Sequence, residues 1–349
     1  MGLDLSKDRI HAVLGGLTRD REFKTIARKA FGNNTKGFSE LEAWIEHHRK
    51  EKELECQVVL EVTGVYHEGV LHYLHAKGYT VCLELAKRVK RYLQVLGHKS
   101  KNDRLDGAGL AQLAVERKLQ PWRPVSAQIL EIRAMLRHRR ALMQARDQFR
   151  NQEHAQEHGA VPNPAVQASL KQMIDALADQ MEQVEGQVKA LVHKDPALHA
   201  RLQRIVESVK GLGWLSVLTV VAETNGFASF SSMRQLVSYA GYDVVENSSG
   251  NFTGKTRISK QGNARIRSAL YMPSLCMAKF KVQPFYALYE RLLERNGGLK
   301  KKALVAIQRK LLVLIYTLWK RGEAFDPSRY ATTKAVSQDR SSLKEVAPV

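Results

Sequence analysis

Residues 56–62, CQVVLEV, form an almost uninterrupted apolar run, which is typical of a strand buried on both faces in the middle of a sheet. Three strand-like segments come earlier in the chain, GLDLS, IHAVLGGL and EFKTIARKAF, followed by the amphipathic segment GFSELEAWIEHHRKE. After the run come a helix-like segment, HEGVLHYLHAKG, another strand, TVCLEL, and two more helix-like segments. Three strands followed by alternating helices and strands predict an α/β layer architecture for residues 1–125.

Beyond a boundary at Trp122-Arg-Pro the chain becomes polar and helical. Two long helices are indicated, residues 126–158 and 166–194, with the turn-rich GAVPNP between them. In the second helix apolar residues recur at three- and four-residue steps: Leu170, Met173, Ile174, Leu177, Met181 and Val184. This pattern predicts a helical hairpin or an intermolecular coiled coil over residues 126–205. Residues 206–323 predict a mainly α-helical domain, and the Ser-, Thr- and charge-rich residues 324–349 predict a disordered tail.

The charge balance indicates a polyanionic partner. The chain has 55 lysines and arginines against 35 acidic residues, a net charge of +20, which attracts nucleic acid first and an acidic membrane surface second. No apolar run reaches transmembrane length and the N-terminus is too polar for a signal peptide, so we expect a cytoplasmic protein without a membrane partner. Three scattered cysteines exclude a disulfide framework and a structural zinc site.

Four acidic residues occupy positions from which they could converge. Asp4 lies in the first strand, Glu61 ends the central strand, and Asp103 and Asp106 share one face at the start of a helix. Ligands gather at strand ends and adjoining helix starts in α/β sheets, so the four carboxylates predict a site for Mg²⁺, with Mn²⁺ as the alternative ion. Each acid taken alone is also explained as a helix cap, a first-turn acid or a solvated strand end.

Two further patterns carry less information. Residues 86–101 hold six cations and no acid, which suits either a phosphate-tracking patch or a solvated face; they are Lys87, Arg88, Lys90, Arg91, Lys99 and Lys101. The pairs His72 with His75 and His154 with His158 have helical spacing, but without a third ligand they indicate surface histidines.

The segment ENSSGNFTGKTRISKQGN, residues 246–263, places two adjacent serines among glycines and cations. Ser248 and Ser249 have no histidine nearby in the sequence to activate a hydroxyl. Either this is a basic surface loop with ordinary serines, or one serine attacks an anionic group that the cations hold. The cations are Lys255, Arg257 and Lys260, followed by Arg265 and Arg267.

These motifs match a known family. GLDLSK, LEVTGVYHEGV and KSKNDRLDG resemble the RuvC-like DEDD domain, an RNase H-type fold, of one insertion-sequence transposase family. GLGWLSVLTVVAE and YAGYDVVENSSGNFTGKTRISKQGNARIRSAL resemble its carboxy-terminal domain, so the resemblance covers nearly all of residues 1–323 in the family's order. One departure is Gly107, where the family's D-x-x-D-A motif has alanine; glycine is a poorer helix former but too small to block a site.

The resemblance implies a DNA recombinase that moves an insertion sequence through a circular form. It implies guidance by a structured bridge RNA, whose loops pair with donor and target DNA. It implies Mg²⁺ on Asp4, Glu61, Asp103 and Asp106, and a nucleophilic serine that forms a covalent phosphoserine link, for which we favour Ser249 over Ser248. A composite site between subunits is also implied, and hence a homo-oligomer, dimer or tetramer, in a prokaryotic cytoplasm and at the nucleoid when active.

The expected phosphate contacts are Lys99, Lys101, Lys255, Arg257, Lys260, Arg265 and Arg267.

Two other functions stay open. A RuvC-like nuclease that hydrolyses DNA with water needs the four acids but not Ser249. A non-enzymatic nucleic-acid-binding protein needs neither, and its acids serve as caps and strand ends.

Overall fold

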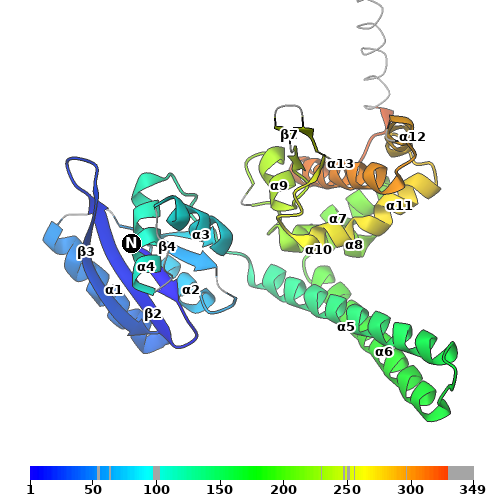
Figure 1. The fold of residues 1–349 in the computed structure, drawn as a ribbon, viewed down its shortest axis with the longest axis horizontal. Helices are drawn as coiled ribbons and strands as arrows, with labels where there is room; N and C mark the ends of the chain where they lie inside the picture. Colours follow the sequence, from blue (N-terminus) through cyan, green and yellow to red (C-terminus); the bar gives the residue numbers. More distant parts are fainter. Residues whose placement is uncertain are drawn as a thin grey trace, which may run out of the picture. The chain divides into compact units, whose positions relative to one another are not determined.

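The computed structural model describes residues 1–52, 56–62, 64–96, 103–228, 230–246, 248–249, 252–254, 256–295 and 297–328. The chain divides into two compact units, Met1–Pro124 and Val125–Val349, which are drawn in Figure 1. Each unit has hydrophobic clusters of its own, so each is described by itself.

A five-stranded mixed sheet forms the first unit, with the strand order β3-β2-β1-β4-β5. The strands are β1 (Gly2–Leu5), β2 (Arg9–Leu17), β3 (Phe23–Gly32), β4 (Gln57–Val62) and β5 (Thr80–Leu85). β1, β2 and β3 pair antiparallel, whereas β4 pairs parallel with both β1 and β5. The apolar run CQVVLEV contains β4, and the predicted order of three strands followed by alternating helices and strands is confirmed.

Helices cover both faces of this sheet. The helices are α1 (Thr35–Lys52), α2 (Glu68–Ala76), α3 (Ala86–Val95) and α4 (Asp103–Glu116). Leu41 of α1 and Leu71 of α2 share a hydrophobic cluster with Leu3 and Leu60 on one face. Leu110 of α4 and Val89 of α3 share a second cluster with Val59 on the other face. Strand residues of alternate parity therefore face different helix pairs, as a sheet buried on both sides requires.

Helix α4 lies unusually close to β1. A Cβ atom added to Gly2 would come within 2.5 Å of the Ala111 backbone nitrogen and closer still to the Gly107 carbonyl oxygen. A Cβ added to Gly107 would lie 2.9 Å from Val13 Cγ2. The glycine that departs from the family motif is thus explained by packing, because it lets the helix rest directly on the neighbouring strand β2.

Replacing Gly2 with alanine should therefore push α4 away from β1. We expect the variant to lose more than about 2 kcal/mol of unfolding free energy, since the methyl group meets backbone atoms that cannot turn aside. Gly16→Ala is the matched control, because a Cβ there meets only Ile26 Cδ1, at 3.8 Å. Urea unfolding followed by circular dichroism measures both; equal stability of the two variants would contradict the packing argument.

The second unit is built mainly from helices. They are α5 (Ala127–Glu157), α6 (Pro164–His193), α7 (Pro196–Ser208), α8 (Trp214–Glu223), α9 (Met233–Tyr239), α10 (Ala264–Ala269), α11 (Tyr271–Lys279), α12 (Phe285–Arg295) and α13 (Lys300–Arg321). The described residues between α9 and α10 include the two-residue strands β6 (Val244–Val245), β7 (Ser248–Ser249), β8 (Phe252–Thr253) and β9 (Arg257–Ile258). Among the described residues, none of the helices combines the length and hydropathy of a membrane span.

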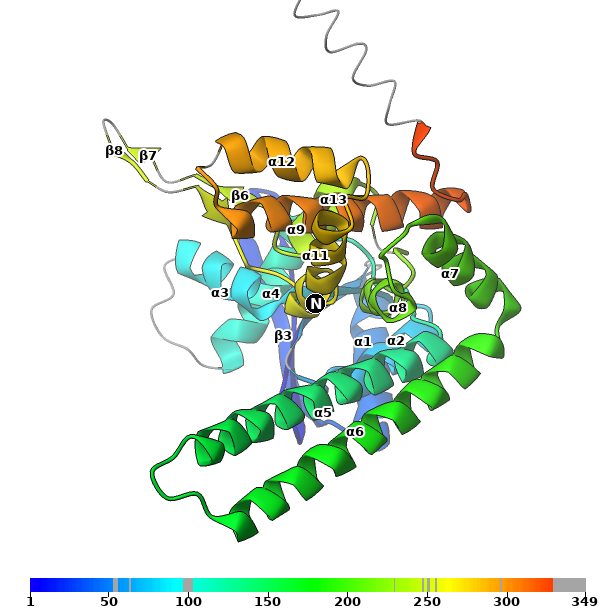
Figure 2. The same cartoon turned by 90° about the vertical axis from the view of Figure 1, so that its right-hand side faces the viewer.

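Helices α5 and α6 pack against each other as a long hairpin, which is clear in Figure 2. Each begins at a capped residue: the Ser126 hydroxyl accepts from Ile129 N, and the Asn163 amide oxygen accepts from Ala165 N. At its base, Ile132 and Val188 belong to the same hydrophobic cluster as α8 and α13. The stretches expected as separate domains, 126–205 and 206–323, thus share one core.

This helical body extends past the predicted start of the tail. Phe325 is buried in the same cluster, and its ring lies 6.3 Å from that of Phe285. The expected tail therefore begins too early at residue 324. Residues 329–349 lie outside the described residues.

Candidate active site

Three carboxylates lie in register across the parallel strands of the first unit. Leu3 of β1 pairs with Leu60 of β4, so Asp4 and Glu61 are the next residues at the same level of the two strands. Glu61 in turn pairs with Glu84 of β5. Paired residues point to the same face of a sheet, and this face is the one that Gly2 presents to α4. Asp4 and Glu61 are therefore neighbours at the carboxyl ends of their strands, where α/β sheets bind ligands.

Helix α4 begins at the same end of the sheet. Its last turn, at Ala114, lines a cavity with Met1 and Leu14, which belong to the opposite end of β1 and β2. Gly107, near the start of the helix, packs against β2 close to His11, the residue that pairs with Asp4. The first turn of α4 therefore lies toward the Asp4 end of the strand.

Asp106 is in that first turn and is half-buried. Asp103 is the first residue of the helix, and its side chain lies outside the described part of the chain. The strand ends of Asp4 and Glu61 and the helix turn of Asp106 thus lie toward the same end of the sheet, and the convergence of their carboxylates with that of Asp103 stays a prediction.

Glu84 is an acid of this row that the sequence reasoning missed. It is only 5% exposed, and its Oε1 accepts a hydrogen bond of 3.1 Å from Arg88 Nη1. Burial raises the pKa of the Glu84 carboxyl above its ordinary value, although the Arg88 charge opposes that shift. The signal was present in TVCLEL, where Glu84 has the same parity as the buried Cys82 and thus points inward.

The serines of the second unit lie on paired short strands. In β7 and β8, Ser248 pairs with Thr253 and Ser249 pairs with Phe252; β6 and β9 pair below them. We call the described parts of residues 244–258 the serine hairpin. Ser249 is exposed, and β7 and β8 extend beyond the helices in Figure 2. The side chain of Ser248 lies outside the described residues, as does Lys255. Ser249 is therefore accessible to a large substrate.

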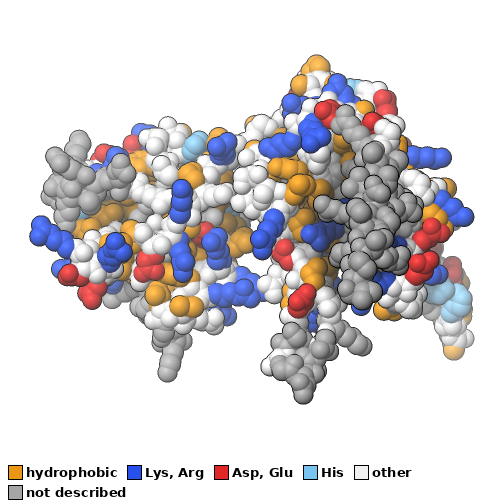
Figure 3. Space-filling model, turned by 90° about the horizontal axis from the view of Figure 1, so that it is seen from above, with side chains coloured by type: hydrophobic (Ala, Val, Ile, Leu, Met, Phe, Trp, Pro, Cys, Tyr) orange, Lys and Arg blue, Asp and Glu red, His pale blue; other side chains and the backbone are white. Residues whose placement is uncertain are grey.

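Cations follow the serines in the chain. Arg257 on β9 and Lys260 are exposed, and Arg265 at the start of α10 is 46% exposed. Arg267 differs, because its Nη1 donates to the carbonyl oxygens of Ala240 (2.8 Å) and Gly262 (3.2 Å) and so holds the local fold. Basic side chains are widely spread over the face seen in Figure 3. Lys99 and Lys101, the other predicted phosphate contacts, lie outside the described residues.

A buried carboxylate ties the loop before α10 to the helical hairpin. Glu223, at the end of α8, accepts two hydrogen bonds from Arg137 of α5, at 2.8 and 2.9 Å, and one from Asn263 Nδ2 at 2.8 Å. Asn263 also caps α10, because its Oδ1 accepts from Arg265 N. Burial acts to raise the pKa of the Glu223 carboxyl, but the hydrogen bonds and charge of Arg137, with Asn263 and Arg265, outweigh it and leave that pKa lowered. The segment after the serine hairpin is therefore fixed in place.

Glu223→Gln should destabilise the protein by about 2 kcal/mol at pH 7, less than for a fully buried pair, because Arg137 is 43% exposed. The unfolded chain protonates this carboxyl near the ordinary pKa of 4.5, and the folded protein only at lower pH. The ionised form therefore stabilises fully above pH 4.5, and this stabilisation is lost as the pH falls through the lower folded pKa. Urea unfolding of wild type, Glu223→Gln and the exposed control Glu182→Gln measures the unfolding free energy at each pH. A stability difference between wild type and Glu223→Gln that does not change with pH would contradict this prediction.

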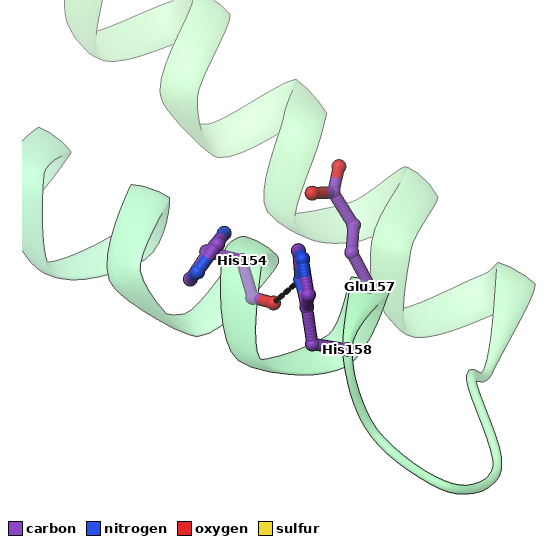
Figure 4. A group of neighbouring side chains, drawn as sticks. All are labelled: His154, Glu157 and His158. Atoms are coloured by element: carbon purple, nitrogen blue, oxygen red, sulfur yellow. Dashed lines mark hydrogen bonds between the residues drawn. The ribbon is translucent and has the colours of Figure 1, made fainter.

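The two histidine pairs have different surroundings. The rings of His72 and His75 stand edge-on to Trp122, at 5.1 and 5.2 Å. His154 and His158 lie at the exposed end of α5 with Glu157, and one ligand atom from each lies within 4.8 Å of the others (Figure 4). His158 Nδ1 hydrogen-bonds the His154 carbonyl oxygen at 2.9 Å. Glu157, which was not predicted from the sequence, is the third member of this exposed group, and its mixture of nitrogen and oxygen ligands differs from the carboxylates of the sheet.

Comparison with known proteins covers both units. A family model of DEDD transposase domains, described as "Transposase", matches residues 1–162, and a model described as "Transposase IS116/IS110/IS902 family" matches residues 203–290. The pilin gene-inverting protein of Moraxella lacunata is 26% identical over 332 residues, 93% of this chain and 97% of the relative. The transposase for insertion sequence element IS1111A of Coxiella burnetii is 24% identical over 296 residues, 77% and 79% of the two chains. The first match contains the acid row, and the second contains Glu223 and the serine hairpin.

Proposed function

We propose that this chain is an RNA-guided DNA recombinase that works through a covalent phosphoserine intermediate. Residues 1–162 and 203–290 match two transposase models of the IS110 family, and the relatives are a transposase and a gene-inverting protein. The observation that carries this proposal is that the two units hold different chemical groups. Carboxylates gather at one end of the sheet in the first unit, and Ser249 is exposed on a basic hairpin of the second.

Mg²⁺, or Mn²⁺ in its place, would be held by Asp4, Glu61 and Asp106 together with Asp103. The donor set fits a hard cation, because it consists entirely of carboxylate oxygens. When bound, the ion supplies Lewis-acid polarisation of a DNA phosphodiester. The register of Asp4 with Glu61 supports this assignment, since it brings two of the donors together before any ion binds.

The Ser249 oxygen forms a bond to the phosphorus of one DNA phosphodiester while the bond from phosphorus to the leaving DNA oxygen breaks. The hydroxyl proton of Ser249 passes to water, and the leaving oxygen takes up a proton. The serine ester retains the energy of the phosphodiester, so a DNA hydroxyl can later attack it and reseal a strand without ATP. Arg257, Lys260 and Arg265 would hold the phosphates around the break, which their exposure supports.

Guidance by a structured bridge RNA follows from the family resemblance and agrees with the net charge of +20. The partners would be donor DNA, target DNA and this RNA, and the working form a homo-oligomer at the nucleoid. Specificity carried by base pairing leaves little need for a base-reading code in the protein. The gene-inverting relative supports DNA rearrangement in general, and inversion would use the same serine chemistry.

The test is a denaturing gel of the purified protein with Mg²⁺, its flanking RNA and labelled donor and target DNA. We expect a protein–DNA adduct that disappears when the RNA is omitted or replaced by one that cannot pair with the target. Cleavage without an adduct would indicate a water-using nuclease instead. Binding without cleavage at any Mg²⁺ concentration would indicate a non-enzymatic nucleic-acid-binding protein.

A further inference from the structure

A small pocket of the second unit lies outside everything assigned above. It has a volume of about 290 Å³ and is formed where the end of α6, the helix α7 and the first residue of α8 meet. Apolar side chains such as Leu202 line part of it, and the polar side chains around it are Lys189, His193, His199, Gln203 and Glu207. Trp214 contributes an aromatic wall. This volume is at the lower end for ligand sites, which limits the occupant to a group of about one nucleotide in size.

The ring of Trp214 could take a planar ligand on the face that Lys189 covers. The indole is half-buried and packs against the hydrophobic core of the unit. Lys189 Nζ lies over the ring, 5.4 Å from its centroid. A long, exposed lysine side chain can move aside at low cost, and a nucleobase stacks on tryptophan over the same surface. The lysine would then remain beside the stacked base as a cation.

The edge of the pocket offers hydrogen-bonding groups rather than a net charge. Gln203 Nε2 donates to Glu207 Oε1 at 2.6 Å, which leaves the amide oxygen of Gln203 as an acceptor. The rings of His193 and His199 lie 4.4 Å apart. Lys189 and Glu207 balance each other in charge, so the pocket suits an uncharged planar group better than a phosphate.

The geometry points to a binding site for one unpaired nucleobase, from RNA or from single-stranded DNA, stacked on Trp214. An unpaired base exposes both its ring face and its pairing edge, and aromatic side chains with nearby hydrogen-bonding groups recognise such bases. The backbone phosphates of the same strand would lie outside the pocket; Lys194, which follows the pocket residue His193 in the chain, is exposed. This inference relies on the proposed function only for the presence of a nucleic-acid partner, and not for any chemical step.

The test uses the full chain in EDTA, where no metal-dependent cleavage interferes. Fluorescently labelled single strands, oligo-rU and oligo-dT, are titrated by anisotropy and compared with an abasic strand of equal length. We expect wild type to bind the strands with bases about 5- to 100-fold more tightly than the abasic strand. Trp214→Leu should lose that preference, whereas Trp214→Phe should keep most of it because a phenyl ring still stacks. Tighter binding of the rU strand would assign the base to RNA, and tighter binding of the dT strand would assign it to single-stranded DNA.

Tryptophan emission gives a second readout. Binding should quench wild-type fluorescence, and Trp214→Phe should lose the quenching while it keeps the affinity. Trp122→Phe, in the other unit, is the matched control and should keep the quenching. Equal affinity of wild type for abasic and base-containing strands, or equal quenching in Trp214→Phe, would overturn the inference. A wild-type preference for bases without any covalent adduct in Mg²⁺ would leave this site standing and refute the proposed chemistry alone.

Discussion

Replacing Ser249 with alanine should abolish the covalent protein–DNA adduct and strand exchange, because no other group would form the ester that retains the phosphodiester energy. We expect loss of adduct below detection, a reduction of at least about 10⁴-fold, as for an enzyme deprived of its nucleophile. DNA and RNA affinity should change less than about threefold, since a single hydroxyl on an exposed strand contributes little to binding. Denaturing gels and mobility shifts on the same preparation measure both quantities.

Ser248→Ala is the matched control, because it removes the same hydroxyl one residue away on the same two-residue strand. Adjacent strand residues as a rule have side chains on opposite faces, so we expect the two variants to differ in their effect on the adduct. Adduct in Ser248→Ala and none in Ser249→Ala would assign the nucleophile. The reverse pattern would exchange the two residues, and adduct or cleavage that survives in both would exclude a serine intermediate.

The strand positions of the candidate site could be predicted because a short segment indicates a strand by its own composition. CQVVLEV could be recognised as a central strand from its own composition, and Glu61 at its end followed. The sheet register that makes Asp4 and Glu61 neighbours was not available from the sequence. The sequence indicated only the general tendency of α/β sheets to gather ligands at strand ends.

What the sequence did not predict depends on packing between distant segments. In the sequence, Glu223 is an ordinary acid at the end of an apolar helix. Its partners lie far away in the chain, since Arg137 comes 86 residues earlier and Asn263 comes 40 residues later. The parity of Glu84 with Cys82 can be read from the sequence, but its pairing with Glu61 depends on the register of β4 and β5. Trp214 follows a glycine-rich turn in the sequence, and the pocket beside it exists because α6 and α7 close on it. Contacts of this range carry no periodic signal.

Asp4→Asn should eliminate DNA cleavage in Mg²⁺ while leaving the fold intact. Asparagine has the shape of aspartate, so the packing of β1 under α4 is retained, but one negatively charged oxygen ligand is lost from the row. Metal assistance contributes several kcal/mol to transition-state stabilisation, so we expect a fall in cleavage rate of about 10³-fold or more. Single-turnover cleavage at saturating protein measures the chemical step.

The control is Asp8→Asn, an exposed acid in the turn that follows β1. It changes the net charge equally and lies four residues away, so any effect of charge on DNA binding appears in both variants. Mn²⁺ binding, followed by the loss of the free-ion electron paramagnetic signal, should weaken in Asp4→Asn and not in Asp8→Asn. This readout separates the acid row from the serine step, because Ser249→Ala should bind Mn²⁺ as wild type does. Wild-type cleavage and Mn²⁺ affinity in Asp4→Asn would mean that the carboxylates at the ends of β1 and β4 support the sheet and not the chemistry.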